Sequence, residues 1–196
     1  MSFKQILKFF VKLIVSKNKW EKWNGSVGII ENAKFKDDGM ISVHNCDFIH
    51  DKRFQDAFNG SLQGLPRQEI FSTIRWRAHI CCWAANQALH LEGDFVECGV
   101  WYGMLSKTIV EYTNFGSSGK DFYLMDAFGN LGRDDRPEYE PDIFPLVKQR
   151  FSQYPNVHLV QGLIPSTLPE VPSDKIAFLA IDMNGVEPEE AALKYF

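Results

Sequence analysis

A carboxylate followed by two glycines makes the segment GDFVECGVWYG (93–103) the part of the sequence best suited to chemistry. A short apolar run typical of a buried strand ends near Glu97, and Gly99 and Gly103 open the turn into a helical pattern. Glycine lets a ligand approach the backbone closely. The first N–H groups of a helix have no hydrogen-bond partner within the helix, so a ligand can accept hydrogen bonds from them. The segment therefore predicts a ligand site at the end of a strand.

The charge of this segment indicates what kind of ligand would bind. The spacing Glu-x-Gly-x-x-x-Gly differs from the dinucleotide fingerprint Gly-x-Gly-x-x-Gly, because an acid stands at the first position. A carboxylate is unfavourable beside a pyrophosphate and favourable beside an ammonium or sulfonium group. S-adenosylmethionine (SAM) carries both cations, together with a carboxylate that can accept hydrogen bonds from helix N–H groups. Two alternatives stay open: a nicotinamide-dependent enzyme, which the acid disfavours, and a tight turn with Glu97 in a purely structural hydrogen bond.

Acidic or small residues also end the next three predicted strands. Asp126 ends the second strand, where an acid can accept hydrogen bonds from both hydroxyls of a ribose. Gly162 ends the third strand and leaves room for the flat edge of an adenine. Asp182 ends the fourth strand, and Asn184 follows it. Because ligands of doubly wound sheets bind outside the carboxyl ends of the strands, we expect these residues to surround one crevice with Glu97.

Strands alternate with helices from about residue 65 onward, which predicts an α/β protein with a doubly wound, Rossmann-like sheet and helices on both faces. The predicted strands span 94–98, 122–126, 156–162 and 175–182, and the predicted helices span 67–93, 102–113, 142–154 and from 186 onward. Upstream we expect an amphipathic helix over 3–15, an irregular connection to about 36, a strand or extended loop over 39–50, and a helix over 51–60 that Asp51 caps and Gly60 ends. We expect a helical and irregular extension over 1–64 and a domain over 65–196 that is C-terminally incomplete, truncated after its fourth strand.

Composition narrows the classes of protein. The 196 residues, 45% of them hydrophobic, suffice for one well-buried domain. Residues 37–196 carry 13 basic and 23 acidic side chains, a balance that argues against nucleic-acid binding. The four cysteines lack metal-ligand or redox spacing, which predicts reduced thiols in a cytoplasmic protein.

The first 36 residues have the opposite charge, with eight lysines and two glutamates. Lys4, Lys8 and Lys12 form a narrow basic stripe on an otherwise apolar helix. This helix is shorter than the roughly 20 apolar residues needed to span a bilayer, and it lacks a signal-peptide pattern. We expect it to pack on its own domain or on a second subunit of a homo-oligomer. The alternative is contact of residues 1–17 with an anionic membrane surface, which would make the protein peripheral to a membrane.

Four segments, GDFVECGVWYG, FYLMDAFGN, VHLVQGLIPSTLP and IAFLAIDMN, resemble in order and spacing the macrocin O-methyltransferase (TylF-like) family of class I SAM-dependent methyltransferases. RWRAHICCWAANQALHLEG resembles the helix that this family places before its first strand, so the resemblance covers roughly 65–196. It implies a methyltransferase fold, SAM as methyl donor and a sugar or related small-molecule hydroxyl, free or in a glycan, as acceptor. The alternative is a SAM-binding module without catalytic activity, or an interaction subunit.

The resemblance also implies roles for individual residues. The residues that would hold SAM are Glu97, Gly99, Gly103 and Ser106 at its methionine end, Asp126, Ala127 and Phe128 at its ribose and adenosine, and Gln161 and Gly162 at its adenine. Family members that methylate sugar hydroxyls use a divalent cation, usually magnesium. Asp182 matches the first metal ligand, Asn184 stands where a second acid is usual, and the later acidic pair has no counterpart before Phe196.

Two residues are candidates for catalysis. A bound cation would lower the pKa of a ligated hydroxyl, which makes Asp182 a metal ligand and a general base with Asn184 as helper. His79 would be a base or a substrate contact, or else a partly buried histidine of the core. The polar loop over 132–142 is either a lid or a solvated connection.

Overall fold

The computed structural model describes residues 33–129 and 142–196. The helix predicted over 3–15 and nearly all of the polar loop over 132–142 lie outside the described residues. The chain divides into two compact units, Met1–Asp47 and Phe48–Phe196.

The described part of the first unit contains an antiparallel hairpin of β1 (Phe35–Asp37) and β2 (Met40–Ser42). Its turn residues Asp38 and Gly39 have φ angles of 51° and 68°. An Asp-Gly pair favours this left-handed hairpin turn, because both positions must adopt positive φ. The sequence prediction of an irregular connection followed by a strand or loop covered this hairpin only in part.

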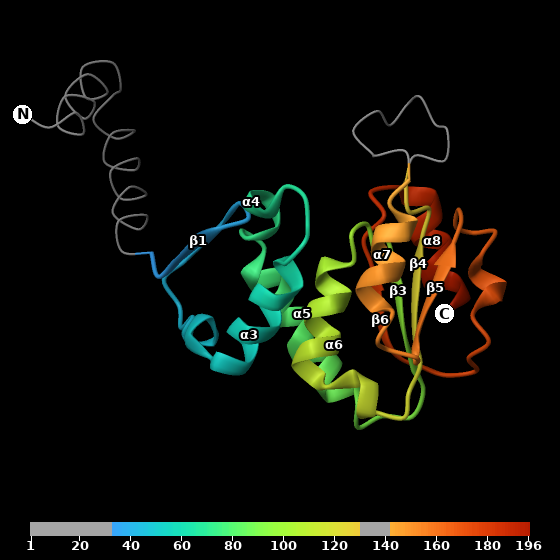
Figure 1. Ribbon diagram of the computed structural model, residues 1–196, viewed down its shortest axis with the longest axis horizontal. Helices are drawn as coiled ribbons and strands as arrows, with labels where there is room; N and C mark the ends of the chain where they lie inside the picture. Colours follow the sequence, from blue (N-terminus) through green and yellow to red (C-terminus); the bar gives the residue numbers. More distant parts are fainter. Residues whose placement is uncertain (1–32, 130–141) are drawn as a thin grey trace, which may run out of the picture. The chain divides into compact units, whose positions relative to one another are not determined.

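The second unit contains a four-stranded parallel sheet with the order β5-β4-β3-β6 (Figure 1). The strands are β3 (Asp94–Cys98), β4 (Phe122–Asp126), β5 (Val157–Gln161) and β6 (Ile176–Ile181). The chain steps outward from β3 to β4 and β5, and then crosses back to place β6 on the other side of β3. The order therefore reverses between β3 and β6, which confirms the doubly wound class and the four predicted strands.

Helices cover both faces of this sheet, as predicted. One face packs against α5 (Arg75–Ala88), α6 (Met104–Thr113) and α7 (Phe144–Phe151), and the other packs against η3 (Leu168–Glu170) and α8 (Val186–Tyr195). Successive side chains of a strand point to opposite faces of the sheet, so each strand contributes to the hydrophobic layers on both faces. Phe95 points into the first layer, where its ring lies 5.6 Å from that of Phe122, and the next residue, Val96, points into the second.

The single long helix predicted over 67–93 is wrong. The structure divides it into α4 (Gln68–Phe71) and α5, and α5 ends at Ala88. The hydroxyls of Ser72 and Thr73 donate to backbone carbonyls three residues earlier. Side chains that bond the backbone locally compete with helical hydrogen bonds, so the apolar repeat continues while the helix does not.

The helix predicted over 51–60 is α3 (Lys52–Leu62). Asp51 caps it as predicted, because its side chain accepts a 2.7 Å hydrogen bond from the N–H of Phe54. The predicted end at Gly60 is wrong by one half-turn. Phe54 and Phe58 are buried in the main core, and the second compact unit begins at Phe48.

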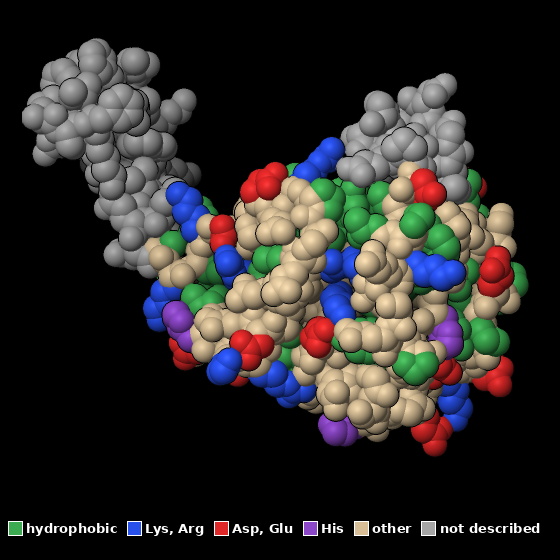
Figure 2. Space-filling view, in the orientation of Figure 1, with side chains coloured by type: hydrophobic (Ala, Val, Ile, Leu, Met, Phe, Trp, Pro, Cys, Tyr) green, Lys and Arg blue, Asp and Glu red, His purple; other side chains and the backbone are tan. Residues whose placement is uncertain are grey.

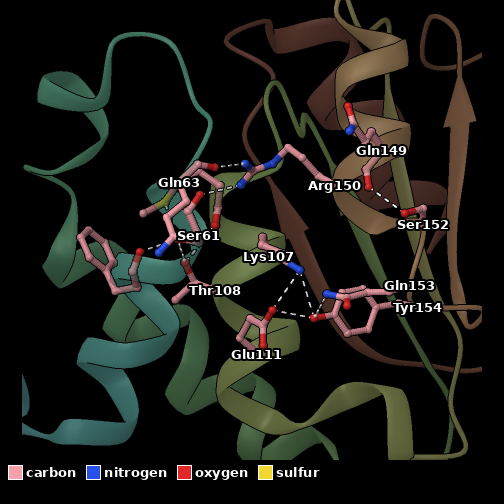
Figure 3. Close-up of polar contacts among 12 residues, drawn as sticks. Ser61, Gln63, Lys107, Thr108, Glu111, Gln149, Arg150, Ser152, Gln153 and Tyr154 are labelled. Carbon is pink, nitrogen blue, oxygen red and sulfur yellow. Dashed lines mark hydrogen bonds and ion pairs between the residues drawn. The ribbon is translucent and has the colours of Figure 1, made fainter.

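Polar contacts link α7 to α3, α6 to α3 through Thr108 and Ser61, and α6 to Tyr154, which follows α7 (Figure 3). The Arg150 guanidinium on α7 donates to the backbone oxygens of Ser61 at 2.6 Å and Gln63 at 3.0 Å. Near the middle of α6, the ammonium group of Lys107 lies 2.9 Å from the Glu111 carboxylate and 3.0 Å from the hydroxyl of Tyr154. These contacts fix the helix whose first turn faces the carboxyl ends of the strands.

In the part of the chain that the structure describes, the visible face (Figure 2) carries side chains of every type and the cysteines form no disulfide. Acidic and basic side chains are interspersed with apolar ones over the face visible in Figure 2. None of the described helices combines the length and apolarity that crossing a bilayer requires. All four cysteines are free thiols, as their spacing predicted.

Candidate active site

The carboxyl ends of the four strands bring the predicted site residues together. Past the last regular pairs, the N–H groups of Gly99, Gly162 and Asp182 each donate at 2.9 Å to a carbonyl oxygen of the neighbouring strand. Gly162 is joined in this way to Asp126, and Asp182 to the residue before Gly99. The edge therefore presents Gly162, Asp126, Gly99 and Asp182 in that order across the sheet.

Packing requires all three predicted glycines, and a Cβ on Gly162, whose φ is +151°, would lie 2.5 Å from Cγ2 of Thr167. Gly99 has a φ of +93°, and a Cβ built on it would lie 2.1 Å from the backbone oxygen of Asp182. Gly103 has a φ of +70°, and its Cβ would lie 2.6 Å from a ring carbon of Phe151. A side chain at any of these positions would collide with its neighbour and force an unfavourable φ. The turn after β3 therefore packs directly against the residue that follows β6 and against α7.

Asp126 fixes the shape of this turn. Its Oδ2 accepts hydrogen bonds from the N–H groups of Val100 at 2.6 Å and Trp101 at 2.7 Å, and its Oδ1 accepts one from Phe128 at 2.6 Å. Each carboxylate oxygen has two acceptor positions, so these bonds leave Asp126 able to accept from a ribose hydroxyl as well. The residue has a structural role that the sequence alone did not predict.

Glu97 is a buried carboxyl group, with 5% of its surface exposed. The Ser106 hydroxyl on α6 donates to its Oε2 at 2.5 Å, so the structure joins two residues predicted to hold the methionine end. Burial raises the pKa of Glu97 to about 8, the hydrogen bond from Ser106 lowers it, and the negative charges of Asp126 and Asp182 raise it further. A cation bound next to this group would favour its ionised form.

Arg77 is a residue of the site that the sequence interpretation missed. It lies in the first turn of α5, and its Nη1 is 3.3 Å from Oδ2 of Asp182. The sequence offers no feature that singles it out, because Arg75 lies in the same first turn of α5. Burial raises the pKa of the nearby Cys81 thiol to about 11; Glu97 and Asp182 also raise it, and Arg77 lowers it.

The remaining predicted cofactor and metal residues occupy less specific positions. Ala127 follows Asp126 directly and is half-buried, and Gln161 is exposed at the end of β5. The Phe128 side chain is 1% exposed and its ring lies 5.4 Å from that of Phe144, so only its backbone borders the edge. Asn184 is exposed, with a left-handed φ of 55°.

His79 lies in an aromatic cluster. Its ring stacks on Phe48, with centroids 4.0 Å apart and planes 11° from parallel, and it meets the ring of Phe54 edge-on at 5.9 Å. Burial lowers the pKa of His79, and the charge of Asp51 raises it. These contacts are those of a core histidine, and they lend no support to the predicted role as a base.

The described side chains do not by themselves fit a magnesium site. Nowhere in 33–129 or 142–196 do three or more His, Cys, Asp or Glu side chains gather in an arrangement that could hold a metal ion. The carboxylate predicted as first ligand, Asp182, is instead paired with the Arg77 guanidinium. Magnesium as cofactor stays a prediction from the resemblance.

A doubly wound parallel sheet, with acids and glycines along its carboxyl edge at the switch point, defines a Rossmann-like α/β protein, a class in which ligands bind at that edge. Comparison with protein families finds a match over residues 75–196 to the family described as Macrocin-O-methyltransferase (TylF). The match extends over more than half of the sequence, and the chain belongs to this family.

A solved structure described as that of the O-methyltransferase NovP has a similar fold, with a TM-score of 0.51 and 22% sequence identity. The match covers 61% of this chain and 58% of that one, so the chain spans somewhat more than half the length of that structure. Comparison with curated proteins finds no match. The resemblance and the fold predicted from the sequence are both confirmed.

Proposed function

We propose that this protein binds SAM at the carboxyl edge of the sheet and transfers its methyl group to a hydroxyl oxygen of a sugar or a related small molecule. The observation that carries the proposal is the gathering of Glu97, Gly99, Asp126 and Asp182 at one switch point, in a chain of this family. Oxygen as the acceptor atom is supported by the family's own description.

The residues at the edge suit the parts of SAM. The Glu97 carboxyl, ionised, would offset a positive charge of the methionine end, and the turn from Gly99 to Gly103 would offer backbone groups to it. Asp126 would accept a hydrogen bond from ribose, and the backbone of Gly162 would border adenine, since Thr167 occupies the place of a side chain at that position. SAM itself would supply a methyl group made electrophilic by the sulfonium.

Asp182 is the carboxylate best placed to assist the acceptor. A sugar hydroxyl is a poor nucleophile at neutral pH, so a group that takes its proton during attack accelerates the transfer. Asp182 lies at the switch point with 54% of its side chain exposed, and its backbone is fixed by a hydrogen bond to β3. The proton of the hydroxyl would pass to this carboxylate as the oxygen–carbon bond forms and the sulfur–carbon bond breaks.

Calorimetric titration with S-adenosylhomocysteine (SAH) and with NAD tests the binding step. We expect SAH to bind with a dissociation constant below about 100 μM, a binding free energy near 5.5 kcal/mol, and NAD to give no saturable heat. Absence of SAH binding at millimolar concentration, or tighter binding of NAD, would overturn the proposal. SAH binding without methyl transfer to any acceptor tested would favour the inactive SAM-binding module.

Replacing Asp182 with alanine should separate catalysis from cofactor binding. We expect transfer of labelled methyl from SAM to fall by at least about 100-fold, the usual contribution of a positioned base, with SAH affinity within about threefold of the original protein. The assay would use macrocin or whichever glycoside is methylated by the unaltered protein. Asp174→Ala, an exposed acid just before the amino end of β6, is the matched control and should retain full activity. Normal turnover by Asp182→Ala would remove the catalytic role.

A further inference from the structure

Arg77 places a guanidinium group at the switch point. It contacts the carboxylate of Asp182 from α5, although the two residues are 105 positions apart in the sequence, and 47% of its side chain is exposed. Asp182 follows β6 and lies against Gly99, which follows β3. The guanidinium therefore lies beside the switch point between β3 and β6, the place where ligands bind in this class of sheet.

The ion pair between Arg77 and Asp182 contributes little to the free energy of folding. Both side chains are about half exposed, and ion pairs of this kind stabilise proteins by roughly 0–1 kcal/mol. The backbone of Asp182 is held independently, by its hydrogen bond to Cys98 and by the close approach of Gly99. In addition, a cation in the first turn of α5 is unfavourable with respect to the helix dipole. The pair with Asp182 therefore contributes little to folding, and the guanidinium charge can serve another role.

The charges at the carboxyl edge of the sheet indicate that role. The negative charges of Asp126 and Asp182 both act on Glu97, so the edge is rich in carboxyl groups. These groups suit the ammonium and sulfonium of SAM, but they repel the carboxylate that the same ligand carries. Arg77 supplies a positive charge beside them, and the planar fork of a guanidinium matches the two oxygens of a carboxylate.

We propose that Arg77 binds the carboxylate of the methionine end of SAM. The inference rests on the proposed function and deepens it, because it assigns to α5 a subsite that the sequence had left to the N–H groups at the start of α6. Arg77 then acts with Glu97 to recognise the amino acid end of the ligand, one residue binding its anion and the other its cation.

A cycle of ligand and protein changes, measured by calorimetry, tests this assignment. The ligands are SAH and its decarboxylated counterpart, S-adenosyl-3-thiopropylamine. The proteins are the unaltered chain, Arg77→Met, which keeps the aliphatic stem, and Arg77→Lys, which keeps the charge and loses the fork. We expect the unaltered protein to prefer SAH by about 10- to 100-fold, the value of a charge-assisted hydrogen-bonded pair. Arg77→Met should lose this preference through weaker SAH binding alone, and Arg77→Lys should retain part of it.

Arg75→Met is the matched control, because Arg75 lies in the same helical turn but stacks over Phe58, 5.4 Å from its ring centroid. It should leave the preference for SAH unchanged. A full preference for SAH in both Arg77 variants would overturn the assignment while leaving the proposed function intact. Failure of the unaltered protein to bind either ligand would overturn both. Thermal melting of each variant confirms folding, and Arg77→Lys keeps the test decisive if Arg77→Met does not fold.

Discussion

Alanine at position 99 is expected to lower the free energy of unfolding by about 3–5 kcal/mol and to abolish SAH binding. The added Cβ would stand 2.1 Å from the backbone oxygen of Asp182 and 2.6 Å from its carbonyl carbon. Backbone cannot move aside as a flexible side chain can, so the turn after β3 must shift, which also displaces the peptide groups beside Glu97. A φ of +93° adds a conformational cost of its own for any residue with a side chain. Urea unfolding and calorimetry with SAH measure the two effects.

Gly119→Ala is the control that isolates the conformational part of this cost. Gly119 has a φ of +73°, but a Cβ there would meet no atom within 4 Å. We expect a loss of only about 1 kcal/mol and unchanged SAH binding. If Gly99→Ala were no more damaging than Gly119→Ala, the close approach of the turn to β6 would be incorrect, and with it the geometry of the crevice.

Glutamine at position 97 is expected to remove most of the pH dependence of stability above pH 5. The pKa of Glu97 is raised to about 8 by burial, from an ordinary value of 4.5, so the folded protein holds this proton more tightly than the unfolded chain. The stabilising effect of the protonated form is therefore complete below about pH 4.5 and is lost as the pH rises to about 8. A buried carboxyl with this shift changes the free energy of unfolding by a few kcal/mol over that interval. Urea unfolding between pH 5 and 9 should show the decline in the unaltered protein and a flatter profile for Glu97→Gln.

The same group couples ligand binding to protons. A cationic ligand that requires the ionised carboxylate should release close to one proton from Glu97 when it binds at pH 7, and affinity should rise toward pH 8. Titration of SAH in buffers of different ionisation enthalpy measures this number, and Glu97→Gln should release none. Ser106→Ala is the companion variant: its hydroxyl lowers the pKa of Glu97, so its loss should move the profile to higher pH. Identical profiles for the original protein and Glu97→Gln would contradict this role of Glu97.

The sequence was sufficient for the order and class of the elements. The four strands of the sheet are short apolar runs bounded by turn residues, and their alternation with helices allows few topologies. It failed at helix limits, as in the break at Ser72 and the extension of α3 to Leu62, because local hydrogen bonds and tertiary packing decide those limits. The hairpin turn at Asp38 and Gly39 could have been predicted from the sequence, because an Asp-Gly pair by itself favours a turn with positive φ angles.

The sequence by itself determined that Glu97, Asp126, Gly162 and Asp182 end successive strands, because a strand's period and its bounding residues are local properties. Only the tertiary structure decided which groups these residues meet. Ser106 meets Glu97, the backbone of the β3–α6 turn meets Asp126, and Arg77 meets Asp182 across 105 positions. Such contacts depend on how α5 and α6 pack on the sheet, and side-chain pairing at long separation leaves no periodic trace in the chain. For the same reason His79 looked like a candidate base, whereas its neighbours in space are aromatic rings.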